Sequence, residues 1–473
     1  MSSHKSSKPL LALPGSYGIP FFSSIYDRLQ FYYFQGRDKF FKTRADEYKS
    51  TVFRTNMPPG PFMAKDPRVI CLLDAVSFQV LFDVSKVEKK DLFTGTYMPS
   101  TSLTGGYRVC AYLDPSEPKH AMNKKLLFSL LSSRHANFLP EFHATFAKLF
   151  DGLDEGVSGP KKTAEFNSLN DVSSFDFCCR AYFGVDPAST SLGTAGPAAV
   201  TKWLAFQLHP LLVVGLPKIL EEIFLHTFPL PPFLVKSDYK KLYNYFSSAA
   251  SKVLDEAEAM GMKREEACHN ILFATCFNSY GGFKVFLPEI MKWVGQAGEP
   301  LHKRLREEVR SVVKADGGSV TVLGLEKMEL TKSVVYEVLR IEPPVVYQYA
   351  RAKKDFVLES HDASFEIKKG EMLFGYQPFA TQDPKVFADA EKFVPDRFVG
   401  DGAAMLRYVY WSNGRETDAP SEGNKQCPGR DFVVLVGRLL VAEFFVRYDS
   451  FTVEVGTSPL GSSVNITSLT KAT

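Results

Sequence analysis

The sequence predicts a mainly α fold with a minor β-sheet region, on three observations. The middle of the 473-residue chain is mostly helical in its hydrophobic pattern. An apolar run at 432–445 has the length and periodicity of a buried helix. Short strand-like segments occur near the start of the chain and again after residue 356. Together these features predict a large helical body beside a small sheet.

The predicted elements follow in order along the chain. After an entry rich in proline and glycine, 26–48 is predicted as an amphipathic, aromatic-rich helix. Segments 51–54 and 69–73 are predicted strands, because their β-branched and apolar residues end at turn residues. Further helices are predicted at 124–131, 144–153, 239–260 and 331–339, and further strands at 356–359 and 363–367. Glycine-, proline- and serine-rich stretches at 156–161 and 186–198 are predicted surface loops within one domain.

The chain is expected to hold one domain at 14–473, preceded by a short N-terminal extension at 1–13. The opening residues 1–8 carry serine and lysine and are similar to a transit peptide in composition, but they are much shorter than one. No stretch reaches the roughly 18 apolar residues that a membrane-spanning helix needs. We therefore expect no transmembrane anchor and no ordinary transit peptide, and a protein that is soluble or peripherally attached.

Composition argues against several classes of function. The net charge is +3 at pH 7 and no basic run is long enough to follow phosphates, so no nucleic-acid partner is expected. The seven cysteines are odd in number and lack a C-x-x-C spacing, which argues against a disulfide scaffold or a zinc site. Forty phenylalanines and twenty tyrosines suit a chain that encloses a bulky apolar ligand or cofactor, although they can equally fill a core.

Cys427 lies in a tight loop directly before the apolar run, within the sequence NKQCPGRD at 424–431. Backbone N–H groups in such a loop and at the helix start point toward the sulfur and favour its thiolate. A thiolate held in this way is a good axial ligand for haem iron and promotes O–O bond cleavage. A lone cysteine before a helix is more often only a small buried residue. Other segments must therefore decide the role of Cys427.

Two charged motifs precede this cysteine in a fixed order. Glu337 and Arg340 have the i, i+3 spacing that places both on one helix face, and Arg397 follows in the turn PDRF at 395–398. Each motif alone is typical of a solvated ion pair or an ordinary turn. With Cys427 they form an ordered set that resembles the haem-thiolate cytochrome P-450 superfamily. The resemblance implies a P-450-like helical fold, haem b with Cys427 as axial ligand, and a buried Glu337–Arg340–Arg397 network.

The cysteine loop departs from the usual pattern of that superfamily. Gly423 and Gly429 match it, whereas Lys425 replaces the usual arginine and Pro420 occupies the place of a phenylalanine. The stretch 412–422 is also longer than usual. These differences indicate a specialised branch.

A second departure concerns the helix that delivers protons to bound O₂ in oxygen-activating members. Here the corresponding segment reads FATCFNSYGG at 273–282 and contains no aspartate or glutamate. Asn278 cannot carry protons at neutral pH. Reductive activation of O₂ is therefore not expected, and neither is a reductase partner. A substrate that brings its own O–O bond needs neither.

Both departures resemble the plant fatty-acid-hydroperoxide enzymes, which comprise allene oxide synthases, hydroperoxide lyases and divinyl ether synthases. Specific matches are NMPPGPF at 56–62, GTYMPS at 95–100, LDPSEPKH at 113–120, GEMLFGYQPF at 370–379 and WSNGRET at 411–417. The resemblance implies a fatty-acid hydroperoxide substrate. It also implies that Lys89, His120 and Lys124 hold the haem propionates, with Lys425 as a further cofactor-binding residue.

Two positions favour an allene oxide synthase within this branch. Asn278 resembles the asparagine that orients the hydroperoxide, since a neutral amide can donate and accept hydrogen bonds. Phe93 matches a site that carries phenylalanine in allene oxide synthases and commonly leucine in lyases. An aromatic face there can stabilise an electron-poor carbon and favour dehydration over C–C scission. Val345 and Gln348 match a substrate-contacting segment.

Lyase and divinyl ether synthase activities remain the alternatives. The resemblance also suggests peripheral membrane or lipid-body association and a plastid-associated or cytosolic location. The sequence predicts no particular oligomeric state.

Overall fold

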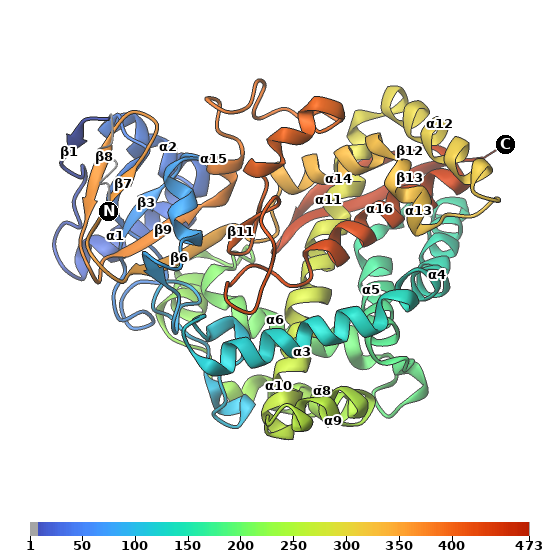
Figure 1. Ribbon diagram of the computed structural model, residues 1–473, viewed down its shortest axis with the longest axis horizontal. Helices are drawn as coiled ribbons and strands as arrows, with labels where there is room; N and C mark the ends of the chain where they lie inside the picture. Colours follow the sequence, from blue (N-terminus) through green and yellow to red (C-terminus); the bar gives the residue numbers. More distant parts are fainter. Residues whose placement is uncertain (1–7, 473) are drawn as a thin grey trace.

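The computed structural model describes residues 8–472 and confirms the mainly α fold class with small sheets (Figure 1). In Figure 1 helices fill the right and lower parts of the view, and two sheets gather at the left beside the N-terminal segment. The α-helices of the described part are α1 (Phe22–Leu29), α2 (Arg37–Tyr48), α3 (Pro118–Arg134), α4 (Phe138–Ser158), α5 (Phe166–Phe183), α6 (Gly196–Leu208), α7 (Lys218–Glu221), α8 (Lys236–Ala249), α9 (Ser251–Ala259), α10 (Arg264–Phe273), α11 (Gly281–Ala297), α12 (Glu299–Ala315), α13 (Val322–Lys327), α14 (Glu329–Ile341), α15 (Gln377–Thr381) and α16 (Arg430–Arg447).

The largest sheet has five strands in the order β2-β3-β9-β6-β4. A three-stranded sheet has the order β1-β8-β7, another joins β12, β13 and β5, and β10 pairs with β11 as a short hairpin. The strands are β1 (Leu10–Leu11), β2 (Val52–Asn56), β3 (Arg68–Leu72), β4 (Val87–Glu88), β5 (Ala164–Glu165), β6 (Tyr347–Ala352), β7 (Phe356–Glu359), β8 (Ser364–Ile367), β9 (Met372–Tyr376), β10 (Tyr410–Trp411), β11 (Gly414–Arg415), β12 (Tyr448–Ser458) and β13 (Gly461–Lys471). β3 runs parallel to β9, with Ile70 opposite Leu373, so segments from both halves of the chain build one sheet.

The core of the helical part lies where α16 meets α4, α5 and α11. The ring of Phe432, in the first turn of α16, lies 4.6 Å from that of Phe138, 5.8 Å from that of Phe177 and 5.6 Å from that of Phe283. α14 packs on α16 and is buried on nearly all sides. This aromatic packing fixes the start of α16, and hence the loop that carries Cys427.

Two predicted helices are each divided in two. The predicted helix 26–48 breaks at Gly36, whose φ of 80° lies outside the helical region, and the π-helical turn η1 (Gln30–Phe34) precedes the break. Glycine adopts this conformation without a steric penalty, so it separates α1 from α2. The predicted helix 239–260 divides at Ala250 into α8 and α9. The prediction of one continuous helix was wrong in both places, because apolar periodicity alone does not reveal a short interruption.

The predicted loops and the N-terminal extension also differ from expectation in part. α4 continues to Ser158, inside the predicted loop 156–161. The stretch 186–198 contains two 3₁₀ turns and the start of α6. Leu10 and Leu11 pair with β8, while residues 1–7 lie outside the described residues. Within residues 8–472, no helix combines the length and apolarity needed to cross a bilayer.

Candidate haem and hydroperoxide site

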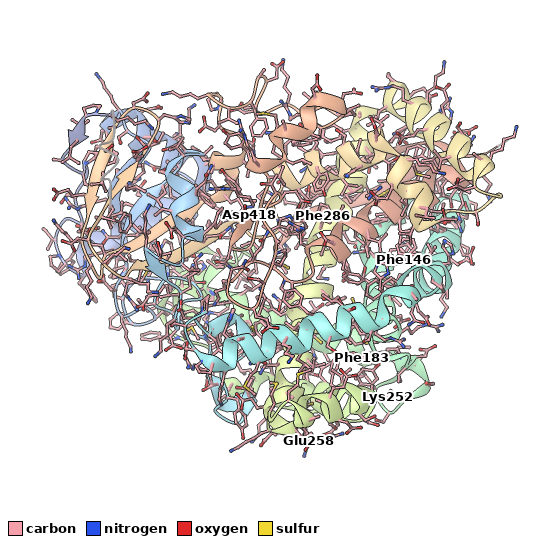
Figure 2. All side chains as sticks on the ribbon, in the orientation of Figure 1. Phe146, Phe183, Lys252, Glu258, Phe286 and Asp418 are labelled. Carbon is pink, nitrogen blue, oxygen red and sulfur yellow. The ribbon has the colours of Figure 1, made fainter. Side chains whose placement is uncertain are left out.

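The Cys427 loop is held by the hairpin β10–β11 and by α3. The N–H of Cys427 donates to the carbonyl of Ser412 at 3.0 Å. The side chain of Gln426 donates to the carbonyl of Arg415 at 2.6 Å. A Cβ atom at Gly414 would come within 2.4 Å of the Gln426 side chain, so only glycine allows this approach. Figure 2 places Asp418, which belongs to the same loop, near the centre of the view.

Cys427 is half-buried, and several groups act on its thiol in opposite directions. Desolvation raises the pKa of the Cys427 thiol, whereas a backbone hydrogen bond from Gly429 and the charge of Lys124 lower the pKa. The backbone hydrogen bond thus favours the thiolate as predicted, but desolvation outweighs it and the net pKa of the thiol is raised. A bound metal ion deprotonates a coordinating thiol outright. The loop therefore presents the sulfur, and an iron ion would supply the charge that ionises it.

Four basic side chains gather around this loop from three segments. Lys89 follows β4, His120 and Lys124 lie on α3, and Lys425 belongs to the loop itself. Lys124 donates to the carbonyls of Gln426 (2.5 Å) and Asn424 (3.1 Å). Lys425 donates to the carbonyls of Ala111 (2.6 Å) and Leu113 (2.7 Å). The structure thus brings together the three residues assigned to the haem propionates, Lys89, His120 and Lys124, and the further cofactor-binding residue Lys425.

Burial makes these cations costly. Burial lowers the pKa of Lys124 and of Lys425 to about 8 each, lowers the pKa of His120 to about 4, and holds the pKa of Lys89 well below its usual value. Within residues 8–472, no carboxylate forms an ion pair with any of the three lysines. The carboxylate of Asp114 accepts a hydrogen bond from the backbone N–H of Lys89, at 2.7 Å, but none from its ammonium group. Asp114 acts on Lys89 and Lys425 through its charge but not as an ion-pair partner, and buried charges are normally paired, so the cluster suits a further anionic group.

The residues present fit a haem group. Two propionates would add negative charge beside the lysine cluster, and a carboxylate accepts hydrogen bonds from ammonium groups. The Nδ1 atom of His120 is buried and has no hydrogen-bond partner among the described residues, which is consistent with a missing ligand group. Cys427 offers a soft sulfur ligand for the iron. Charge and donor chemistry therefore agree.

Asn278 lies in the π-helical turn η11 (Ala274–Tyr280), between α10 and α11. Its side chain is exposed and makes no hydrogen bond within residues 8–472. The rings of Phe93 and Phe277 lie 5.8 Å apart, so Phe93 stands next to the turn that carries Asn278. π-helical turns occur frequently at functional sites. Phe93 and the turn that carries Asn278 are therefore neighbours in space.

Tyr182 connects this turn to the cysteine helix, and sequence reasoning missed it. The hydroxyl of Tyr182, on α5, hydrogen-bonds that of Ser279 at 2.8 Å. The ring of Tyr182 lies 5.3 Å from that of Phe432, which is five residues after Cys427. No local pattern marks Tyr182, because the contact joins three helices that are distant in sequence.

Val345 and Gln348, the other predicted substrate residues, differ in their surroundings. Val345 is 37% exposed. Gln348 is buried in β6, and its amide N–H groups donate to Gln377 Oε1 at 2.6 Å and to the carbonyl of Trp411 at 3.0 Å. The amide of Gln348 is thus occupied by bonds within the protein, and only Val345 presents an open surface.

The Glu337–Arg340–Arg397 set forms a buried network, at the position predicted from the sequence. Arg340 donates to both carboxylate oxygens of Glu337, at 2.7 and 2.8 Å, and the Nε of Arg397 lies 3.0 Å from them. Glu337 and Arg340 are fully buried. Carbonyls of Thr381 and Ala390 accept further bonds from Arg340, so the buried charges are paired and hydrogen-bonded. This network connects α14 to the segment before the cysteine loop.

Comparison with known proteins agrees with this site. The cytochrome P450 family model matches residues 300–460, from α12 to β12. Allene oxide synthase 2 of Oryza sativa subsp. japonica is 62% identical over 467 residues, which cover 98% of this chain and 97% of the relative. The chloroplastic allene oxide synthase 1 of Solanum lycopersicum is 59% identical over 465 residues (98% and 87%), and the chloroplastic allene oxide synthase of Arabidopsis thaliana is 59% identical over 465 residues (98% and 90%). This chain therefore belongs to the cytochrome P450 family, within the group of allene oxide synthases.

Proposed function

We propose that the protein is an allene oxide synthase, a hydroperoxide dehydratase of oxylipin and jasmonate-type metabolism. It converts a polyunsaturated fatty-acid hydroperoxide to an allene oxide and water, without O₂ or NADPH. The observation that carries this conclusion is the 59–62% identity to allene oxide synthases over 98% of the chain. We also infer that 14–473 works as one haem-thiolate domain, since β3 pairs with β9 and β5 with β13 across the chain.

The site residues divide the work between holding the cofactor and orienting the substrate. Cys427 would ligate the haem iron, and Lys89, His120, Lys124 and Lys425 would face its carboxylates. Thiolate-ligated haem, when bound, supplies the one-electron chemistry that cleaves an O–O bond. The fixed backbone around Cys427 keeps the sulfur in one position, and the lysine cluster favours an anionic group beside it.

On the substrate side, Asn278 would hold the hydroperoxide by hydrogen bonds. Its free amide can donate to one peroxide oxygen and accept the O–H of the other. The turn η11 contains no carboxylic acid, so the protein offers no acidic side chain there to deliver protons to O₂. Phe93 would face the carbon that becomes electron-poor, and its ring would favour loss of a proton from the neighbouring carbon over C–C scission.

Product analysis tests the proposed function. Purified protein that is mixed with the 13- or the 9-hydroperoxide of octadecatrienoic acid, without NADPH, should form ketols and a cyclopentenone from an allene oxide. Recovery of a short aldehyde and an oxo acid would identify a lyase, and recovery of a divinyl ether would identify the third activity. Activity that appears only with a reductase and O₂ would contradict the proposal.

Replacing Phe93 with leucine is expected to shift products from allene oxide toward aldehydes. Leucine fills a similar volume but has no aromatic face to stabilise an electron-poor carbon. The measurement is the ratio of ketol to aldehyde by gas chromatography. Phe356→Leu is the matched control, because Phe356 is also half-buried but lies in β7. An unchanged ratio in Phe93→Leu would remove Phe93 from the branching step.

We further propose that the protein associates peripherally with a lipid surface in the plastid, through an exposed apolar face. The face consists of aromatic and aliphatic side chains from α1, the loop at 62, α7, η9 (Glu222–Thr227) and the residue after it. Its exposed residues are Phe21, Phe22, Phe62, Ile219, Leu220, Ile223, Phe224 and Phe228. The ring of Phe62 lies 5.5 Å from that of Phe21 and 5.5 Å from that of Phe228. Exposed apolar clusters of this kind mark interaction surfaces, and two relatives are named chloroplastic.

The double replacement of Phe22 and Phe224 by serine is expected to lower binding to phospholipid vesicles by about tenfold or more. Burying one such side chain contributes about 1.5–3 kcal/mol, and about 1.4 kcal/mol corresponds to a factor of ten. Vesicle flotation measures the bound fraction. The control is Leu323→Ser with Val357→Ser, two exposed apolar residues on α13 and β7. Equal binding by both double variants would contradict the assignment of this face.

A further inference from the structure

The turn of the β10–β11 hairpin holds an asparagine in an unusual backbone conformation. Asn413 has φ of 65°, in the left-handed region that glycine and asparagine tolerate best. The residue is half-buried, and the hairpin is only two residues long on each side. Its position directly before Gly414 places it beside the glycine that approaches Gln426 of the cysteine loop.

The side chain of Asn413 is the hydrogen-bond partner of the Lys89 ammonium, which donates to Oδ1. No other side chain within residues 8–472 bonds that ammonium. The Nδ2 of Asn413 donates to the hydroxyl of Ser412 at 2.8 Å, and its backbone N–H donates to Gln348 Oε1 at 3.1 Å. The amide is therefore fixed with its oxygen toward Lys89 and its nitrogen away from it.

The same turn also contacts the loop that carries Cys427. Ser412, the neighbour of Asn413, accepts the N–H of Cys427 at 3.0 Å. Lys89, Asp114, Asn413 and Lys425 line one small cavity of about 10 Å³, so two of the buried lysines and the asparagine converge on a common space. One tight turn thus sets the position of a buried lysine and of the cysteine loop together.

We propose that Asn413 is a positioning residue that holds the Lys89 ammonium in place for a haem carboxylate. A neutral amide oxygen suits this task, because it orients the ammonium without neutralising it. An aspartate at this position would pair with Lys89 and compete with the haem carboxylate. A glycine would keep the left-handed backbone but would remove the acceptor. The inference rests on the proposed function only in requiring that the protein binds haem.

The test measures haem release from the purified holoenzyme to an excess of apomyoglobin, followed by absorption. Asn413→Gly and Asn413→Asp are each expected to speed release by about tenfold, the size expected when a hydrogen bond to a charged group is weakened. Lys49→Gly is the matched control, because Lys49 has φ of 49° at the exposed end of α2. This control should release haem at the unaltered rate.

A double-mutant cycle with Lys89→Met separates positioning from a general loosening of the turn. If Asn413 acts through Lys89, adding Asn413→Gly to Lys89→Met should change the release rate by less than about twofold. Full additivity would overturn the inference, and so would an unchanged rate in both single variants. A wild-type protein that binds haem but forms no allene oxide would refute the proposed function alone. A wild-type protein that cannot bind haem would refute both.

Discussion

Replacing Cys427 with serine is expected to remove the thiolate-type haem spectrum and to lower turnover of the hydroperoxide by more than about 100-fold. The loss should exceed the roughly 10- to 100-fold effect of altering a residue that only supports a metal ligand. A serine hydroxyl ionises far less readily than a thiol, so the variant has no anionic sulfur to offer the iron. Absorption and resonance Raman spectra of the purified protein measure the ligand, and the rate of hydroperoxide loss measures turnover.

Cys110→Ser provides the matched control for this exchange. Cys110 is half-buried like Cys427, and the charge of Lys124 lowers the pKa of both thiols, but Cys110 lies on another segment, η4 (Cys110–Tyr112). This variant should keep the spectrum and the activity of the unaltered protein. A Cys427→Ser variant with an unchanged spectrum would show that another group ligates the iron.

The sequence predicted best those features that depend on residues close together in the chain. The loop before the apolar run at 432–445 located Cys427, and α16 follows it at 430–447. The spacing of Glu337 and Arg340 on one helix face likewise predicted their contact, at 2.7 Å. In these cases the contact lies within one short segment, so the sequence of that segment is sufficient to predict it.

The features that escaped prediction depend on contacts between distant segments or on a single backbone angle. Tyr182 bonds Ser279 across 97 positions, and no periodicity reveals that pair. Asn413 belongs to the motif WSNGRET, which indicated the family but not its left-handed turn or its bond to Lys89. Gln348 was matched to a substrate segment, yet β6 turns its amide toward Gln377 and Trp411. Side-chain direction within a sheet is set by register, which the sequence does not state.

Burial opposes the local electrostatic field at Cys427. The loop geometry suggested that Cys427 favours its thiolate, but desolvation outweighs the hydrogen bond from Gly429 and the charge of Lys124, and the pKa of the thiol is raised. The same desolvation lowers the pKa of Lys425 to about 8. Haem carries a cationic metal and anionic carboxylates. The metal would favour the thiolate of Cys427, and the carboxylates would favour the charged form of the buried lysines. The pKa shifts of these groups in the protein alone therefore correspond to the charges that haem would bring.

Exchanging Asn278 for glutamine is expected to lower kcat/KM for the hydroperoxide by about 100-fold, because a displacement of about 1 Å at a reacting group has a cost of that size. The added methylene moves the amide while keeping its donors and acceptor. Asn278 bonds no other side chain within residues 8–472, so the exchange breaks no hydrogen bond within the protein and the free energy of unfolding should change by less than about 0.5 kcal/mol. Steady-state kinetics and thermal unfolding of the holoenzyme measure the two quantities.

Asn244→Gln is the control for this exchange, since Asn244 is an exposed asparagine on α8. It should leave both quantities unchanged. If Asn278→Gln kept kcat/KM within about threefold while haem content stayed constant, the amide would not contact the hydroperoxide. The lack of an acidic residue in η11 would then be the one feature of that turn still related to the reaction. If turnover fell together with haem content, Asn278 would act on cofactor retention instead. A selective loss of turnover alone is the result that assigns Asn278 to the substrate.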